Sequence, residues 1–440
     1  MIPFCTTTHS DPPATRPATN NPVKSETFIV SAADQCVKCG LCLPHCPTYR
    51  LLRNEADSPR GRIALMQGLA QGQLKADTQL LTHLDRCLGC LACEKVCPSK
   101  VHYGQLLDSS RDWIETQQRR PRLKQWLRQA GLYLASKPGV WRRSWGLLKL
   151  YQRSGLQTLL RISGLLRLTK LHYLDAQLPE IKTIKKISVQ QSVTMPQPTN
   201  IGLFSGCMEG IVSSTLHQDI VQLLNRIGYE VLIPSTQGCC GALHQHNGAL
   251  ATARTLAQIN INAFNRHNLE TVLYLSSGCG ATLQEYSGLL DNDPPNPKGL
   301  PAFIEAMTFL ANHAQLEQLV FKPLPATIAC LSPCSQRYAT GGDQALDPLL
   351  GLIPDINIIR LNNHCCGAAG SYMLTQPDIA TRLRDEILDT LGENTPRYLL
   401  SANVGCSIHL TSGLRQRGLD IEVIHPLTLL ARQLANDQDY

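Results

Sequence analysis

Two cysteine runs of identical spacing near the N-terminus constrain the fold of this chain more than any other feature. Both have the form C-x2-C-x2-C-x3-C-P, at residues 36–47 and 87–98. Three thiolates at this spacing wrap around one corner of a [4Fe–4S] cubane, and the fourth cysteine binds the other cluster. The runs therefore predict a ferredoxin-like domain with two [4Fe–4S] clusters. One cluster is assigned to Cys36, Cys39, Cys42 and Cys97, and the other to Cys87, Cys90, Cys93 and Cys46.

Zinc and disulfides are the alternatives for cysteines arranged in this way. Zinc needs four ligands in two pairs, whereas each run supplies four cysteines by itself and ends in proline. Of the 18 cysteines, only Cys5 and Cys330 stand apart from the spaced clusters. That pattern in a long chain favours metal ligands over a disulfide framework. We expect Cys5 to be free and without a function, and Cys330 to be a core residue.

The segment between the runs contains two arginines in the sequence Asp-Ser-Pro-Arg-Gly-Arg at residues 57–62. Arg60 and Arg62 can donate hydrogen bonds near an anionic cluster or hold a carboxylate of a partner. The simpler interpretation is a helix start after a proline turn. The residues alone leave both interpretations open.

The C-terminal half contains one four-cysteine pattern twice. In each copy the first and last cysteines are 72 residues apart, with a Cys-Cys-Gly (CCG) triplet between them. Two copies with a shared offset indicate an internal repeat. The first copy comprises Cys207, Cys239, Cys240 and Cys279, and the second comprises Cys334, Cys365, Cys366 and Cys406.

Hydrophobic runs predict three strands in each copy, with helices between them. Strands that alternate with helices predict one small, parallel, Rossmann-like α/β unit per copy. Each cysteine would then lie just beyond the carboxyl end of a strand, where open sheets bind ligands and a helix N-terminus lowers a thiol pKa. The expected strands are 201–206, 229–234, 271–277, 326–332, 356–361 and 398–403.

The occupant of the two CCG sites stays open at this level. Adjacent cysteines reach two neighbouring irons more easily than one ion, which favours an iron–sulfur cluster. A four-cysteine zinc site and a redox-active dithiol are the alternatives. The nearby histidines are expected to make structural hydrogen bonds rather than bind metal; they are His244, His246, His364 and His409.

Residues 111–186 are strongly basic, with 17 Lys or Arg against four Asp or Glu, and contain all four tryptophans. Such helices can lie on an acidic partner or an anionic membrane surface, or form a solvated linker with a buried apolar stripe. Nothing resembles a nucleic-acid-reading module. With no secretory signal and no long apolar run, we expect a cytoplasmic protein, peripheral to the inner membrane at most.

These features divide the chain into five parts and predict a multidomain α+β and α/β fold. No P-loop or GxGxxG motif is present, so no flavin or nucleotide site is expected on this chain. The parts are a flexible tail (1–30), a mainly helical 2×[4Fe–4S] domain (31–110), a basic helical linker (111–198), and two CCG domains (199–320 and 321–440).

The order of these motifs resembles the iron–sulfur subunits of bacterial glycolate oxidase, also called glycolate dehydrogenase. The resemblance covers nearly the whole chain from about residue 30. Its most specific words are CPTYRLL, SPRGR, HLDRCLGCLACEKVCPS, SGCGATLQEY, CCGAAGSY and ANVGC.

The resemblance implies a subunit without a substrate site, which takes electrons from FAD-binding partner subunits that oxidise glycolate to glyoxylate. It passes them to an acceptor other than oxygen, such as quinone. The same role in a lactate or anaerobic glycerol-3-phosphate dehydrogenase complex and a non-enzymatic metal-binding scaffold are the alternatives. The CCG domains are also similar to those of heterodisulfide reductases, but the fuller CCG pattern has five cysteines, whereas each copy here retains four. We therefore do not expect heterodisulfide reductase chemistry.

Overall fold

The computed structural model describes most of the chain from Glu26 onward. The first 25 residues, which hold Cys5 and most of the expected tail, lie outside the described part, as do residues 179–198 of the expected linker. The described ranges are 26–117, 122–136, 138–168, 171–178, 199–213, 215–290, 299–361, 364–392 and 395–435.

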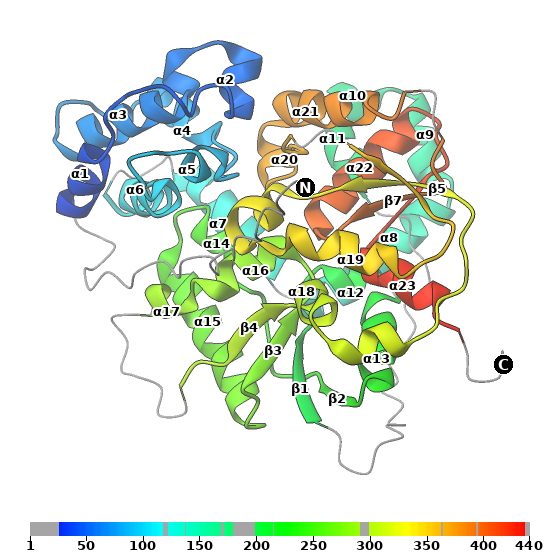
Figure 1. The fold of residues 1–440 in the computed structure, drawn as a ribbon. Helices are drawn as coiled ribbons and strands as arrows, with labels where there is room; N and C mark the ends of the chain where they lie inside the picture. The colour runs from blue at the N-terminus through cyan, green and yellow to red at the C-terminus, as the bar shows by residue number, and fades with distance from the viewer. Residues whose placement is uncertain are drawn as a thin grey trace, which may run out of the picture.

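The N-terminal part is a group of short helices around a small apolar core (Figure 1). Ser58 caps one helix by accepting a hydrogen bond from the Gly61 amide, with Pro59 in the first turn. Asp77 caps the next through the Leu80 amide. Ile63, Met66 and residues of three other helices fill the core. The elements are α1 (Glu26–Asp34), α2 (Pro47–Leu52), the 3-10 turn η1 (Glu55–Asp57), α3 (Pro59–Ala70), α4 (Thr78–Asp85), α5 (Ala92–Lys95) and α6 (Tyr103–Gln117).

The basic segment itself forms a second group of helices, which contacts both of the C-terminal sheet domains. Arg128 donates to the Asn247 carbonyl at 2.9 Å, and Arg415 donates to the Ala176 carbonyl at 2.7 Å. None of the helices that the structure describes is long and apolar enough to cross a membrane. The group comprises α7 (Arg122–Ser136), α8 (Pro138–Arg153), α9 (Leu156–Ile162), α10 (Leu165–Leu168) and α11 (His172–Gln177).

Two four-stranded parallel sheets form the C-terminal half, in the orders β2-β1-β3-β4 and β6-β5-β7-β8. All six predicted strands are present, and each sheet gains one short edge strand that the hydrophobic pattern did not predict. The strands are β1 (Thr199–Phe204), β2 (Tyr229–Leu232), β3 (Thr271–Tyr274), β4 (Ala302–Glu305), β5 (Thr327–Leu331), β6 (Asn357–Arg360), β7 (Tyr398–Ser401) and β8 (Glu422–Ile424).

Helices connect and cover these strands, so the mixed α/β class expected from the sequence is observed. In the first domain they are α12 (Glu209–Val212), α13 (Leu216–Arg226), α14 (Ala242–Gln245), α15 (Leu250–Asn265), α16 (Ser277–Gln284), α17 (Tyr286–Leu289), α18 (Ala306–Ala311) and the 3-10 turn η2 (Ala314–Gln318). In the second they are the π-helical turn η3 (Gln336–Thr340), the 3-10 turn η4 (Gly342–Ala345), α19 (Leu346–Gly351), α20 (Tyr372–Thr375), α21 (Pro377–Asp389), α22 (Val404–Gln416) and α23 (Pro426–Gln433).

The two sheet domains pack through matching positions of the repeat. The Ser277 amide donates to the Ala402 carbonyl at 3.0 Å, and the Val404 amide donates to the Ser276 hydroxyl at 3.3 Å. These residues follow β3 and β7, which occupy the same place in their sheets. One apolar core continues across the boundary from α13 and β3 to β7 and α23. The repeat therefore forms an internal pair of domains.

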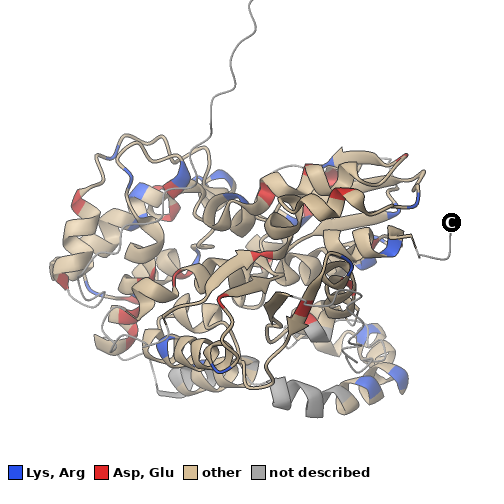
Figure 2. Cartoon of the chain, turned by 60° about the horizontal axis from the view of Figure 1, so that its bottom comes forward, with Lys and Arg blue, Asp and Glu red and all other residues tan. Residues whose placement is uncertain are grey.

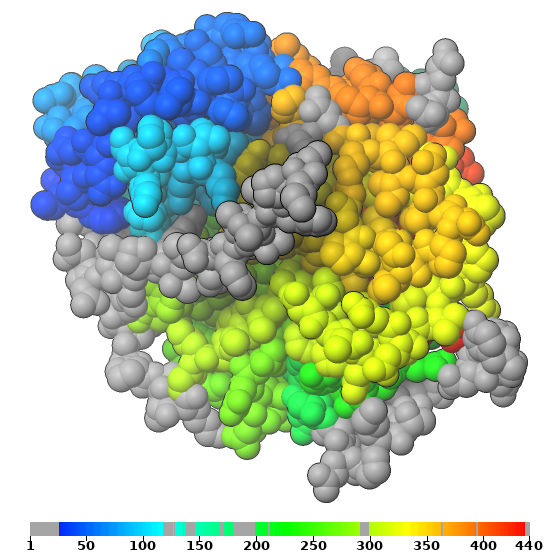
Figure 3. Space-filling view, in the orientation of Figure 1, coloured from blue at the N-terminus to red at the C-terminus, as the bar shows by residue number. Residues whose placement is uncertain are grey.

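The N-terminal domain lies against both members of this pair. Figure 3 shows its blue surface meeting the orange part of the second domain. There Tyr372 donates its hydroxyl to the Arg86 carbonyl at 3.0 Å. On the first domain, Gly248 has a φ of +73°, and a Cβ at this position would lie 2.5 Å from the Arg111 carbonyl oxygen. Only glycine allows this close approach.

Candidate metal centres

The first cysteine run forms an open loop between α1 and α2. Lys38 and Gly40 adopt left-handed backbone conformations, with φ of 55° and 86°, which turn the chain sharply between the thiols. Cys39 is exposed, and the three thiols assigned with it to one cluster are partly exposed; these are Cys36, Cys42 and Cys97. One pocket brings together four predicted ligands and the neighbouring Cys93; the predicted ligands are Cys36, Cys39, Cys42 and Cys97.

The second run forms a similar loop, with left-handed Gly89 and Leu91 at φ of 62° and 61°. Its pocket is lined by the three thiols of the run and by one thiol from the first run. These are Cys87, Cys90, Cys93 and Cys46. Each pocket is thus lined by the thiols of one predicted crossed set, and Cys93 lines both pockets. Two thiol-lined pockets that share a wall fit two neighbouring clusters.

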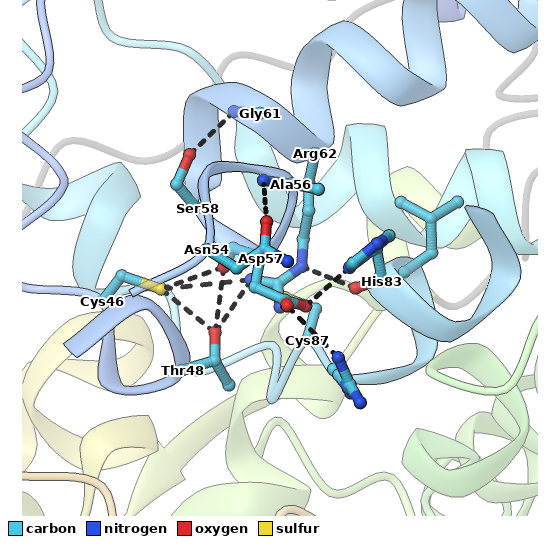
Figure 4. A network of polar contacts seen from close by, with 12 residues as sticks. Cys46, Thr48, Asn54, Ala56, Asp57, Ser58, Gly61, Arg62, His83 and Cys87 are labelled. Atoms are coloured by element: carbon cyan, nitrogen blue, oxygen red, sulfur yellow. Dashed lines mark hydrogen bonds and ion pairs between the residues drawn. The ribbon is translucent and has the colours of Figure 1, made fainter. Parts of the chain in front are cut away.

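A buried polar network supports the second pocket (Figure 4). Arg62 is 1% exposed and Asp57 is 0% exposed. Arg62 donates to the Thr48 hydroxyl at 3.0 Å and to Asp57 Oδ1 at 3.2 Å, and its Nη1 lies 3.9 Å from Cys46 Sγ. Thr48 in turn donates to the Asp57 carbonyl at 3.1 Å. The network therefore places the Arg62 guanidinium beside the Cys46 thiol, which itself donates to the Asp57 carbonyl at 3.8 Å.

The thiols of the second pocket differ in acidity. Burial raises the pKa of Cys90 and Cys93 well above the usual thiol value. Burial also disfavours the Cys87 thiolate, but Arg62, Arg111 and the Tyr103 hydroxyl at 3.4 Å outweigh it, so the pKa of Cys87 is lowered. Among Cys87, Cys90 and Cys93, only Cys87 is thus shifted toward the thiolate form.

In the first CCG domain the four predicted thiols form a continuous chain of contacts. The order is Cys207, Cys239, Cys240 and Cys279. Hydrogen bonds from the neighbouring thiols lower the pKa of Cys239 to about 3, and the Gly241 amide donates to its sulfur at 3.5 Å. The thiols pack in a core cluster made of first-domain residues.

In the second CCG domain the thiols form the same kind of chain. Its order is Cys334, Cys365, Cys366 and Cys406, and the Cys334 and Cys365 sulfurs are 3.8 Å apart. The expected lowering of thiol pKa by helix N-termini is wrong for this copy, and in the first copy the pKa of Cys207 and of Cys240 is likewise raised well above the usual value. The hydrogen bond with Cys365 and burial raise the pKa of Cys334 well above its usual value, because a buried helix end cannot replace lost hydration.

The second CCG site also adjoins the N-terminal domain. Cys90 and Cys334 pack against one apolar cluster that contains Leu88, Cys365 and Tyr372. The second pocket and the second CCG site are therefore neighbours. Sequence separation gave no sign of this contact, which depends on how the domains dock.

Most of the remaining residues singled out from the sequence have ordinary structural surroundings, but within the described part of the chain the buried Nδ1 of His244 has no hydrogen-bond partner. Cys330 is a buried residue of β5, where burial raises its pKa to about 11. His246 Nδ1 lies 3.3 Å from Asp108, and His409 Nε2 lies 3.1 Å from the Ala380 carbonyl. Burial lowers the pKa of His244 and of His364. In the described part of the chain, no group of three or more His, Cys, Asp or Glu residues is spaced to hold a single metal ion.

Sequence reasoning missed several residues around the second pocket. Asp57, Thr48 and Tyr103 were not singled out, although Asp57 belongs to the segment that contains the two arginines. Arg60 and Arg62 differ sharply: Arg60 is bound to Glu55 at 2.6 Å and to the Lys38 carbonyl at 3.1 Å near the surface, while Arg62 is buried.

Comparison with known proteins agrees with this arrangement. Along the chain, the family "4Fe-4S dicluster domain" matches residues 32–101 and "Cysteine-rich domain" matches 201–284 and 328–411. The family "Glycolate oxidase iron-sulfur subunit, linker region" matches residues 123–178. The glycolate oxidase iron-sulfur subunit of Escherichia coli is 31% identical over 388 residues, 86% of this chain and 90% of the relative. The probable counterpart of Bacillus subtilis is 32% identical over 412 residues, 90% of this chain and 92% of the relative.

The chain belongs to the family of glycolate oxidase iron–sulfur subunits. Within this family, the linker match accounts for the basic helices between the dicluster and cysteine-rich parts. A more distant relative is lactate utilization protein A of Exiguobacterium, which is 25% identical over 232 residues, 51% of this chain and 94% of that protein.

Proposed function

We propose that this chain is the electron-transfer subunit of a complex that oxidises glycolate to glyoxylate. The observation that carries the proposal is the pair of adjoining pockets, each lined by the four cysteines of one crossed set. Bound [4Fe–4S] clusters would supply one-electron transfer. Cys36, Cys39, Cys42 and Cys97 would hold one cluster, and Cys87, Cys90, Cys93 and Cys46 the other.

The chain's own residues prepare these pockets for anionic groups. Each of the two loops turns through left-handed backbone positions, which bring the thiols of that loop together. Arg62 and Arg111 favour the thiolate form of Cys87. The apolar side chains of Ile63 and Val101 line the first pocket and reduce the access of water.

The partner subunits would carry the substrate chemistry. Oxidising a 2-hydroxy acid releases two electrons together, which a flavin accepts and then delivers singly. FAD-binding partner subunits would therefore oxidise glycolate, and this cytoplasmic chain would pass electrons to quinone or another acceptor that is not oxygen.

The cysteine-rich domains would extend this path. Their parallel sheets support a Rossmann-like assignment, with domains at 199–320 and 321–440 after the tail (1–30), the dicluster domain (31–110) and the linker (111–198). Four contacting thiols per domain support a further iron–sulfur cluster at each site; zinc, the alternative, is less well supported, because no described group is spaced to hold a single ion. Because Cys334 and Cys90 pack on one apolar cluster, the second site would be next in line.

The linker helices would hold the chain at an anionic membrane surface. Exposed apolar side chains, Leu147, Leu150, Leu159 and Ile162 among them, lie in α8 and α9, as do the exposed cations Arg153 and Arg161. Arg161 is paired with Asp175. Figure 2 marks the Lys and Arg residues in blue. Such a surface binds anionic lipid through both effects. We expect the purified chain to sediment with vesicles of phosphatidylglycerol but not of phosphatidylcholine. Changing Leu159 and Ile162 to Ser should weaken that binding at least several-fold, and unchanged sedimentation would contradict the assignment.

The function is tested by dye reduction with the complex captured anaerobically through a tag on this chain. Glycolate, lactate and glycerol 3-phosphate are offered in parallel, because the relation to lactate utilization protein A makes lactate the second candidate. We expect glycolate-dependent reduction that is lost in Cys36→Ser and Cys87→Ser and retained in Cys330→Ala. Reduction with lactate alone would reassign the complex, and the absence of any flavoprotein partner would reject an electron-transfer role.

A further inference from the structure

Arg62 is a permanent cation enclosed inside the N-terminal domain. Its side chain is 1% exposed and lines the pocket of Cys46, Cys87, Cys90 and Cys93. A guanidinium stays protonated throughout the pH range in which proteins fold. Burying one is strongly unfavourable unless negative groups and hydrogen bonds compensate the charge. Its neighbours therefore indicate what this arginine is for.

The hydrogen bonds of Arg62 fix the guanidinium in one orientation. Nε donates to the His83 carbonyl at 2.8 Å, and Nη2 donates to Asp57 Oδ1 at 3.2 Å. These two hydrogen bonds fix the edge of the guanidinium that faces away from the pocket. Nη1 donates to the Thr48 hydroxyl at 3.0 Å and lies 3.9 Å from Cys46 Sγ. The remaining edge of the cation is thus directed at a cluster ligand (Figure 4).

Asp57 does not fully cancel this charge. Its carboxylate also contacts Arg86 Nη1 at 3.3 Å, so one buried carboxylate is shared between two arginines. His83 Nδ1 lies 3.2 Å from the same carboxylate. Two arginines thus share one buried carboxylate, although Arg86, whose side chain is 32% exposed, is screened more than Arg62.

The first pocket differs in this respect. Its wall includes Lys38 and Arg60, but Lys38 is exposed and the side chain of Arg60 is 32% exposed and paired with Glu55. Water and salt screen such charges far more than buried ones. Two sets of four cysteines thus lie in unequal electrostatic surroundings.

We propose that Arg62 raises the reduction potential of the cluster held by Cys46, Cys87, Cys90 and Cys93. The inference rests on the proposed function, in which a partner flavin supplies one electron at a time. Adding an electron to a four-thiolate cluster increases its negative charge by one, and no proton is required. A fixed cation at 3.9 Å from a ligand sulfur stabilises that reduced form, most strongly where water is excluded.

The test is a redox titration of the anaerobically purified, full-length chain, followed by electron paramagnetic resonance. In Arg62→Met we expect the midpoint potential of one cluster to become more negative, while that of the other stays within error. The Cys87→Ser variant identifies the signal of the affected cluster. Arg62→Lys, which keeps the charge, should restore most of the shift. Arg60→Gln, two residues away, should leave the second cluster's midpoint unchanged.

A second variant predicts a shift of the opposite sign and decides the matter if Arg62→Met fails to fold. Asp57→Asn removes the counter-charge but keeps an oxygen for Arg62, so the midpoint of the same cluster should become more positive. Unchanged midpoints in the folded variants, with full iron and sulfide content, would overturn the inference alone. Wild-type protein without iron and acid-labile sulfide would overturn the proposed function and this inference together.

Discussion

Replacing Cys46 by alanine is expected to remove the cluster of the second cysteine run, although Cys46 belongs to the first run. The reason is geometric, because Cys46 lines the pocket of Cys87, Cys90 and Cys93 and is absent from the other. A cubane that loses one of four thiolates becomes labile, so about half of the iron and sulfide bound by the dicluster domain should be lost. Electron transfer through the complex should fall close to zero.

The mirror variant makes this expectation specific. Cys97→Ala should instead remove the cluster of Cys36, Cys39 and Cys42. Iron and sulfide analysis gives the amount lost, and electron paramagnetic resonance shows which cluster remains. The Cys46→Ala spectrum should match that of Cys87→Ala. A match with Cys36→Ala would show that each run holds its own cluster. Cys330→Ala, which changes a buried core thiol in β5, should keep all of the iron.

Gly61→Ala is expected to destabilise the N-terminal domain by about 2–3 kcal/mol, because the added methyl has no room. A Cβ at this position would lie 1.9 Å from the Glu55 carbonyl oxygen and 3.0 Å from the Ser58 hydroxyl. The carbonyl belongs to the backbone of the η1 turn and cannot rotate away. The turn and the start of α3 must therefore separate, which disturbs both Asp57 and Arg62.

Thermal unfolding of the holoprotein measures this effect, together with the rate at which iron is lost to a chelator. Both should change in Gly61→Ala. The matched control is Gly131→Ala in α7, where an added Cβ would have nothing within 4 Å of it. That change should be neutral or slightly stabilising, since alanine favours the helix by up to about 1 kcal/mol. Equal stability of the two variants would mean that the turn adapts to the methyl group.

The crossed grouping of the cysteines stays a prediction that rests on the spacing within each run and on the rule that the fourth cysteine binds the other cluster. The six predicted strands, four to six residues long, were predictable because each lies in a mostly apolar run of the sequence. The strands β4 and β8 escaped prediction because β8 has only three residues and β4 continues directly into the apolar helix α18, which hides its boundary. Their pairing depends on the neighbouring strand rather than on their own residues.

The different surroundings of Arg60 and Arg62 could not be read from the sequence. Two positions along a helix differ by about 200° around its axis, so the two side chains must face opposite ways. Which of them faces inward depends on the packing of α3 against the Cys46 and His83 segments. The thiol pKa values of the second CCG site also depend on tertiary packing, because packing determines burial. The position of a thiol at a helix end does not reveal how deeply it is buried.

The internal repeat creates two similar thiol sites, but the N-terminal domain packs its cysteines against only the second of them. Here Cys90 packs with Cys334 of the second copy, while the thiols of the first copy stay within their own core. The docking therefore breaks the symmetry that the duplication produced. Each copy is then free to specialise, because a change that harms the site beside Cys90 need not harm its twin.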